Sequence, residues 1–310
     1  MQGEERESSA WIDLAIAALD RGQAESALDY LRRALTLDPN DARAHALLSY
    51  ALLAMRRINA ALVEARTAVA LGPDMSVAHL VMGDAWIAHR KPRKAHEHYE
   101  TARNLDPAHP APLRGLAKYE SFFHRYDAAV ALLESALALD PQDPETLVQL
   151  AQQHLLRGRL PEAEHFARTA LEEQPEHSSA LVIMGHTLLR RGEIQEARQH
   201  AAWALRSGGA GDAMLLLTAI KARENIFLGF WFRFNSVLSE LGPKSMLILV
   251  AAYVTQRFLS LLLDDLGHAQ LSDLVTYAWL GLCVYSWIAP GIFQRMLQRE
   301  LATVRLRRDF

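Results

Sequence analysis

The residues best placed for chemistry are a short group of histidine and glutamate side chains. His96, Glu97 and His98 are consecutive, and Glu100 follows four residues after His96. Metal ligands on a helix need a spacing of three or four residues, because only such neighbours share a face. His96 and Glu100 have that spacing, but two ligands do not complete a site. We therefore predict surface side chains here and no bound metal.

Catalytic motifs are missing from the rest of the chain. The sequence contains no HExxH, no GxSxG and no glycine loop of the phosphate-binding type, and its 13 histidines are scattered. We predict a protein with no catalytic residue and no cofactor. A single cysteine, Cys283, excludes a disulfide framework. The net charge of −3, with no basic stripe breaking the repeat pattern described next, argues against a nucleic-acid partner.

The dominant feature of the sequence is a period of 34 residues. Prolines recur at this spacing as Pro39, Pro73, Pro107, Pro141 and Pro175. Three rows of small residues have the same period: Ala27, Ala61, Ala95, Ala129, Ala163, Ala197; Ala34, Ala68, Ala102, Ala136, Ala170, Ala204; and Ala15, Ser49, Gly83, Ala117, Ala151, Gly185. A fixed period of this length predicts a solenoid of stacked helical units.

Each unit has the pattern of two helices. In the first, Leu14, Ala15 and Ala18 form one apolar face, and Leu31 and Ala34 lie on another. The small rows indicate where two helices cross closely. Glycines at one phase, Gly22, Gly158 and Gly192, are predicted to end the first helix in the left-handed conformation. Asp143 followed by Pro144 has the pattern of a helix N-cap.

These motifs resemble the tetratricopeptide repeat family, in which leucine, small residues, alanines and a proline recur at this period. Six repeats match, covering about two thirds of the chain: 8–41, 42–75, 76–109, 110–143, 144–177 and 178–211. The resemblance implies an all-α, right-handed solenoid of helical hairpins. We expect a flexible tail at 1–7 and a capping helix at 212–225.

The resemblance also implies where a ligand would bind. In this family the first helix of each repeat lines a concave groove, and on this chain the groove positions include Tyr50, Asp84, Arg114, Lys118, Gln152, His186 and Arg190. We expect a protein or peptide ligand to contact several of them; the alternative is that these side chains are only solvated. The paired asparagines with which some members bind a terminal carboxylate are missing, so that mode of binding is doubtful.

The composition changes after the repeats. Residues 226–244 begin with an aromatic segment, for which we predict contact with a membrane interface. The residues concerned are Phe227, Phe230, Trp231, Phe232 and Arg233. The alternative is an aromatic plug packed on the last repeat.

Two apolar stretches, 245–263 and 274–293, are predicted to span a membrane as helices, joined by an extracytoplasmic loop at 264–273. A basic tail, 294–310, follows. Positive charge flanks the pair and is missing from the loop, which predicts that both termini are cytoplasmic. A bacterial inner membrane is favoured. The alternative is a buried helical hairpin in a soluble domain.

Arg257 lies within the first of these stretches. An ionisable residue inside a membrane span is a functional candidate. Two roles stay open: a structural one, with the side chain reaching the interface or Asp264, and contact with a membrane partner.

The sequence thus predicts a non-catalytic, membrane-tethered scaffold that holds a cytoplasmic protein in the groove of its repeats. Membrane lipid and an integral membrane complex are the further partners expected. The alternative function is an assembly factor or accessory subunit of a membrane complex, acting through the hairpin.

Overall fold

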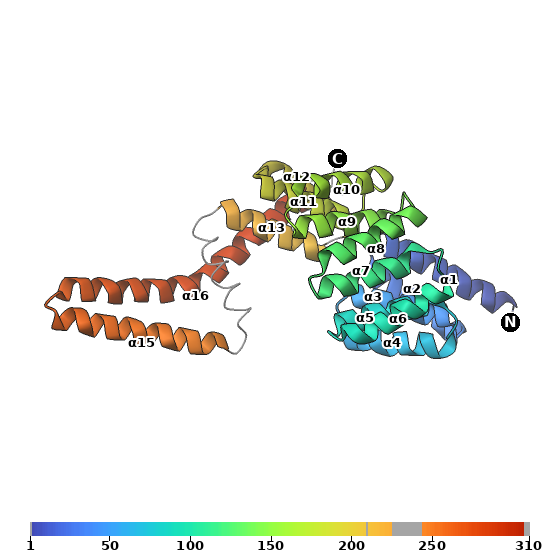
Figure 1. Cartoon of the computed structure of the whole chain (residues 1–310), viewed down its shortest axis with the longest axis horizontal. Coiled ribbons are helices and arrows are strands. Elements are labelled where there is room, and N and C mark those ends of the chain that lie inside the picture. The colour runs from blue at the N-terminus through green and yellow to red at the C-terminus, as the bar shows by residue number, and fades with distance from the viewer. Residues whose placement is uncertain (1, 209, 225–243, 307–310) are drawn as a thin grey trace. The chain divides into compact units, whose positions relative to one another are not determined.

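The computed structural model describes residues 2–208, 210–224 and 244–306, and every regular element within these ranges is an α-helix (Figure 1). The helices are α1 (Gln2–Asp20), α2 (Ala24–Leu37), α3 (Ala42–Ala54), α4 (Ile58–Leu71), α5 (Ser76–Ala88), α6 (Pro92–Leu105), α7 (Pro110–Phe122), α8 (Tyr126–Leu139), α9 (Pro144–Leu156), α10 (Leu160–Glu173), α11 (Ser178–Arg191), α12 (Ile194–Arg206), α13 (Ala210–Glu224), α15 (Lys244–Asp265) and α16 (Ala269–Leu306). The predicted all-helical solenoid is confirmed. Residues 2–7, expected as a flexible tail, form the first turns of α1.

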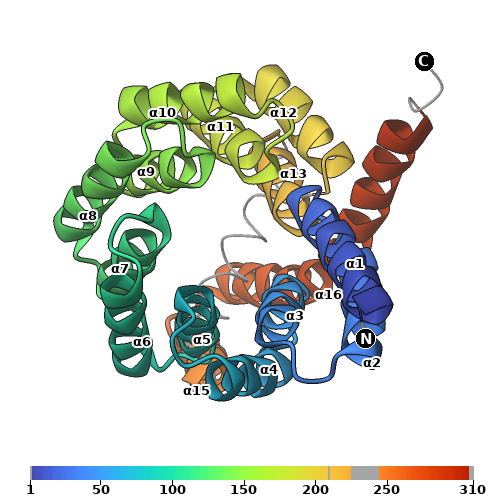
Figure 2. The same cartoon turned by 90° about the vertical axis from the view of Figure 1, so that its right-hand side faces the viewer.

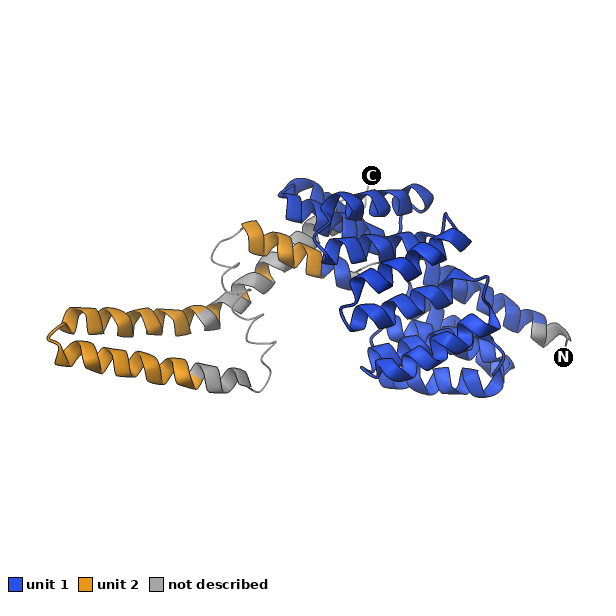
Figure 3. Ribbon diagram, in the orientation of Figure 1, with its two compact units in different colours: residues 1–214 blue, residues 215–310 orange. Residues whose placement is uncertain are grey.

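The chain divides into two compact units, residues 1–214 and 215–310 (Figure 3). Unit 1 holds the repeats as pairs of packed helices. Viewed along the solenoid, α3, α5, α7, α9 and α11 line the inner side, while α4, α6, α8, α10 and α12 lie outside (Figure 2). The first helix of each repeat therefore supplies the concave surface.

Local signals in the sequence set the helix ends. The Asp143 side chain accepts a hydrogen bond from the Thr146 backbone N–H at 3.1 Å, so it caps α9 as predicted. The φ angles of Gly22, Gly158 and Gly192 are +68°, +73° and +93°, which confirms the left-handed conformation. Each such residue ends the first helix of its repeat.

The rows of small residues lie where helices cross. All six alanines of the row that begins at Ala27 are completely buried, and so are Ala15, Ser49 and Ala151. The buried Ser49 hydroxyl has a hydrogen-bond partner, because it donates to the Ala61 carbonyl oxygen at 2.9 Å. A larger side chain at these positions would separate the helices. The 34-residue period of small residues therefore reflects the close packing of helices in every repeat.

The first and last repeats of unit 1 meet at two glycines. A Cβ added to Gly208, whose φ is +91°, would lie 2.5 Å from the Arg21 carbonyl oxygen and 3.2 Å from Cα of Gly22. Only residues without side chains allow two backbones to approach this closely. Six repeats therefore complete a turn of the solenoid, as Figure 2 shows.

Unit 2 contains α15 and α16 as a packed helical hairpin. Ser260 and Ser272, both buried, face each other with their hydroxyl oxygens 2.8 Å apart. The connection is shorter than the predicted loop at 264–273, because α15 continues to Asp265 and α16 starts at Ala269. The helix α16 also continues through most of the predicted basic tail, to Leu306.

The prediction of membrane spans at 245–263 and 274–293 is wrong. No helix in the described ranges is both long enough and apolar enough to cross a bilayer. Within α15, Gln256 and Arg257 interrupt the apolar run, and a charge at the centre of a span is costly.

Three further predictions depended on these spans and are also wrong. They are the membrane localisation, the bacterial inner membrane and the cytoplasmic placement of both termini. Arg257 is an exposed residue of α15, and its predicted intramembrane role depended on these spans. The alternative function as an assembly factor rested on a membrane hairpin and loses that basis. The predicted interfacial residues Phe227, Phe230, Trp231, Phe232 and Arg233 lie outside the described residues.

Candidate functional site on the concave surface

The concave surface is organised by one buried tyrosine, Tyr99 of α6. Its ring lies between two glycines of inner helices: a Cβ added to Gly83 of α5 or to Gly115 of α7 would lie only 2.4 Å from the ring. The ring is completely buried, and its hydroxyl donates to Oδ1 of Asp84 at 2.6 Å. A side chain from an outer helix thus reaches through the inner layer and holds a carboxylate on the concave surface.

Asp84 is held from a second direction by Lys118 of α7. The Lys118 Nζ donates to the same oxygen, Oδ1 of Asp84, at 2.8 Å. The two residues are one repeat apart, so the ion pair links the neighbouring inner helices α5 and α7. The side chains of Lys118 and Asp84 are 41% and 23% exposed, which leaves the pair accessible to a ligand.

A pocket of about 320 Å³ adjoins this ion pair. It is lined by Tyr50, Leu53, Ala54, Asp84, Ile87, Ala88 and Lys118. Although Tyr50 is half exposed, the concave wall removes water from its hydroxyl and raises its pKa, while Lys118 acts in the opposite direction. The pocket combines an apolar wall with a tyrosine hydroxyl and a fixed ion pair, a composition typical of sites that bind side chains of a partner.

Arg114 is the next cation along the groove, and Asp143 neutralises it. The guanidinium donates to Oδ2 of Asp143, and the Thr146 hydroxyl also donates to this carboxylate. Asp143 therefore caps α9 and binds Arg114 of α7 at the same time. Since both side chains are mostly buried, Arg114 has a structural partner and little free charge for a ligand.

The remaining predicted groove residues do not join the pocket. Gln152 is exposed on α9, and Arg190 of α11 donates to the Leu155 carbonyl oxygen at 2.6 Å. Burial lowers the pKa of His186, and the charge of Arg190 lowers it further. The structure thus brings together Tyr50, Asp84 and Lys118, and it places the other four positions elsewhere on the inner helices.

Sequence reasoning missed three residues of this surface: Tyr99, Asp143 and Glu145. Tyr99 belongs to an outer helix, so no rule about groove positions would select it. Asp143 was predicted as a helix cap, but its ion pair with Arg114 depends on the neighbouring repeat and cannot be read from the local sequence. The His177 imidazole, with Nε2 3.7 Å from Oε1 of Glu145, lowers the pKa of Glu145 to about 2.

The described residues also bear on the predicted absence of a metal site. Among them, no group of three or more His, Cys, Asp or Glu side chains could hold a metal ion. His96 and Glu100 lie 3.7 Å apart on the outer helix α6, where Glu100 also pairs with Arg103 at 2.5 Å. The concave surface therefore offers hydrogen bonds, a fixed ion pair and apolar contact.

Comparison with known proteins supports the repeat class. Residues 18–83 match the tetratricopeptide repeat family, and residues 123–204 match the family of anaphase-promoting complex, cyclosome, subunit 3. No curated protein matches the sequence. Among solved structures, a thermophilic tetratricopeptide repeat protein of Thermus thermophilus is 26% identical, with a TM-score of 0.53 over 59% of this chain and 99% of that chain.

A second solved structure is similar in fold alone. It is the hetero-tetramer Cut9–Hcn1 of the anaphase-promoting complex, with 16% identity and a TM-score of 0.61 over 97% of this chain and 57% of that chain. The matches support a solenoid of the tetratricopeptide type. Proteins of this class generally act as non-catalytic scaffolds that bind other proteins.

Proposed function

We propose that the repeat unit is a non-catalytic scaffold that binds a segment of another protein on its concave surface. The observation that carries the proposal is the pocket beside Asp84 and Lys118. Its apolar wall suits an aliphatic or aromatic side chain of the ligand. Its two fixed charges and the Tyr50 hydroxyl suit the polar backbone groups that flank such a side chain.

The charges of the groove also restrict the ligand. Lys118 is paired with Asp84 and Arg114 with Asp143, so a ligand carboxylate would compete with a carboxylate already present at each cation. At Arg114 the ligand would have to break a mostly buried pair, which is costly. A segment with an apolar anchor and few charges fits this surface better.

A filling variant tests the proposal. Ala54 is exposed at the edge of the pocket, and Ala54→Phe would occupy the space without removing a core side chain. Peptides selected on the full chain by phage display should bind this variant at least about tenfold more weakly, a loss of about 1.4 kcal/mol.

The matched control is Ala70→Phe, at an exposed position of the outer helix α4. It should leave the affinity of the selected peptides unchanged. Equal affinity of these peptides for both variants and the unmodified protein would place the binding site outside the pocket. Circular dichroism of each variant verifies that the helical content is preserved.

A further inference from the structure

Six cations gather at the turns that join the paired helices of repeats 2 and 3. They are Arg56, Arg57, Arg90, Lys91, Arg93 and Lys94, within residues 56–60 and 89–94, and neither segment contains an acidic residue. We call these two segments the basic turn surface. It lies on a chain with a net charge of −3, so the excess of positive charge is local.

These cations lack acidic partners, unlike three arginines near the corresponding turns of repeats 4, 5 and 6. In repeats 4 and 5, Arg125 pairs with Glu120 at 3.1 Å and Arg157 pairs with Asp127 at 2.6 Å. In repeat 6, Arg191 pairs with Glu164. None of the six cations of the basic turn surface forms an ion pair with any described residue.

Both lysines of the surface contact an aromatic ring instead. Nζ of Lys94 lies 4.6 Å from the centroid of the Trp86 ring, and Nζ of Lys91 lies 5.4 Å from it. Such contacts hold the ammonium groups in place without cancelling their charge. The positive potential at the turns is therefore kept.

The backbone at these turns has a conformation that disfavours the residues found there. Repeats 1, 5 and 6 have glycine at the left-handed position, whereas repeats 2, 3 and 4 have Arg56, Arg90 and His124, with φ between +57° and +58°. A left-handed residue other than glycine costs roughly 1–2 kcal/mol. Three glycines show that the fold needs no side chain here, so retaining cationic residues at this cost points to a role for the charge.

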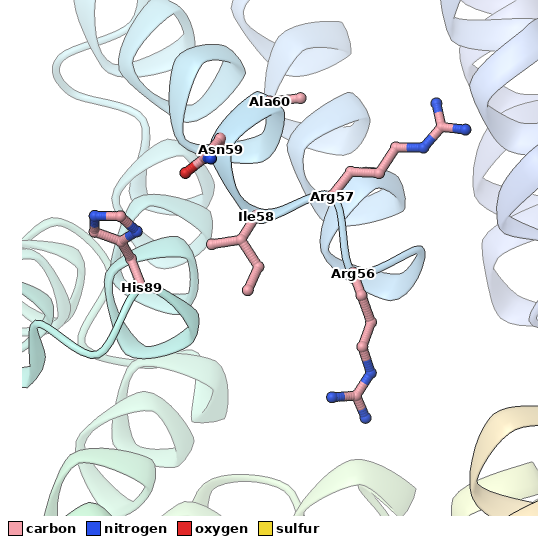
Figure 4. Close-up of a pocket in the computed structure, with 6 residues that line it drawn as sticks. All are labelled: Arg56, Arg57, Ile58, Asn59, Ala60 and His89. Carbon is pink, nitrogen blue, oxygen red and sulfur yellow. The ribbon is translucent and has the colours of Figure 1, made fainter. Parts of the chain in front are cut away.

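A pocket of about 510 Å³ lies between the two turns. It is lined by Arg56, Arg57, Ile58, Asn59, Ala60 and His89. Figure 4 shows His89 of one repeat facing Ile58 of the other across this pocket. Cationic groups and apolar side chains thus border the same depression, which is open to solvent.

We propose that the basic turn surface binds an acidic segment of a partner protein, separately from the concave groove. The apolar lining beside the cations suits a carboxylate side chain followed by an apolar one. A nucleic acid fits less well, because Asp20 and Asp127, near the turns of the adjacent repeats, would repel a long and uniform polyanion.

The geometry suggests how the acidic residues are spaced. Packed helices lie about 8–10 Å apart, and the inner helices α3 and α5 of the two repeats are in contact. An extended segment advances about 3.3 Å per residue, so an acidic residue at about every third position would meet successive turns.

A fluorescence anisotropy titration of the full chain tests this inference. The probe is a fluorescein-labelled peptide of about 12 residues that repeats Glu-Ser-Leu. The key variant is Arg56→Gly with Arg90→Gly, which installs the residue that three other repeats already carry and so preserves the turn. Binding in about 50 mM salt should weaken about tenfold or more, with no fall in Tm, and should also weaken as salt is raised.

A second variant, Arg93→Gln with Lys94→Gln, removes charge without touching the left-handed positions and should weaken binding similarly. The matched control is Arg32→Gln with Arg43→Gln, two exposed cations away from these turns, which should retain the affinity within about twofold. The groove variant Ala54→Phe should also retain it, which separates this surface from the proposed groove.

The inference fails if the probe does not bind, or if the control variant loses as much affinity as the turn variants. It also fails if a peptide that repeats Gln-Ser-Leu binds as well as the acidic one. Tighter binding of oligothymidylate or of phosphatidylserine vesicles, lost in the same turn variants, would overturn an acidic protein segment as the partner.

Discussion

Gly115→Ala should destabilise the repeat unit through its contact with Tyr99. The new Cβ would lie 2.4 Å from Cδ1 of Tyr99, whereas favourable contacts between carbon atoms are about 3.5–4.0 Å long. The ring must therefore move by about 1 Å. It is completely buried between two helices and fixed at its hydroxyl by Asp84, so it has no free space to enter.

The expected magnitude follows from two opposing terms. Overpacking of a core usually costs about 1–3 kcal/mol, and replacing glycine by alanine inside a helix returns up to about 1 kcal/mol. A net loss of about 1–2 kcal/mol should lower Tm by roughly 2–8 °C in a unit of this size. Urea unfolding followed by circular dichroism measures the change in free energy.

A double-mutant cycle isolates the contact. In a Tyr99→Leu background the ring is gone, so Gly115→Ala should cost much less or become stabilising. Gly211→Ala is the matched control, because no atom lies within 4 Å of a Cβ added there. Equal costs of Gly115→Ala in both backgrounds would refute the explanation based on the tyrosine ring.

Three further perturbations probe other contacts. Asp143→Ala should cost about 3 kcal/mol or more in urea unfolding, because it removes a helix cap and leaves Arg114 mostly buried without a partner; a loss below about 1 kcal/mol would mean that Arg114 is solvated. Gly208→Ala should lower Tm, since its Cβ would lie 2.5 Å from the Arg21 carbonyl oxygen, and an unchanged Tm would mean that the first and last repeats do not meet. Four histidines have pKa values lowered by burial: His98, His154, His186 and His200. The folded state binds fewer protons than the unfolded state below about pH 6.5, so stability should be complete above that pH and fall as the pH drops below it. His98→Asn should reduce the slope of stability against pH between about 6.5 and 5, and an unchanged slope would exclude His98 as a source.

The repeat architecture could be predicted from the sequence because the same packing requirements recur every 34 residues. Alanine at every Ala27-type position and glycine at Gly22, Gly158 and Gly192 answer local requirements, namely close helix crossing and a left-handed backbone. The same local logic identified Asp143 as a cap. It misjudged α15, where a count of apolar residues gave too little weight to Gln256 and Arg257 within the run.

Only the tertiary structure decided which polar side chains act together. The resemblance to the tetratricopeptide repeat family placed Asp84 and Lys118 in the groove, but their ion pair depends on the distance between two neighbouring repeats. Tyr99 reaches Asp84 from an outer helix because Gly83 and Gly115 leave room for its ring, a relation among three helices that no single pattern contains. The excess charge at Arg56 and Arg90 was likewise invisible along the chain, since residues 34 apart become neighbours only when the repeats stack.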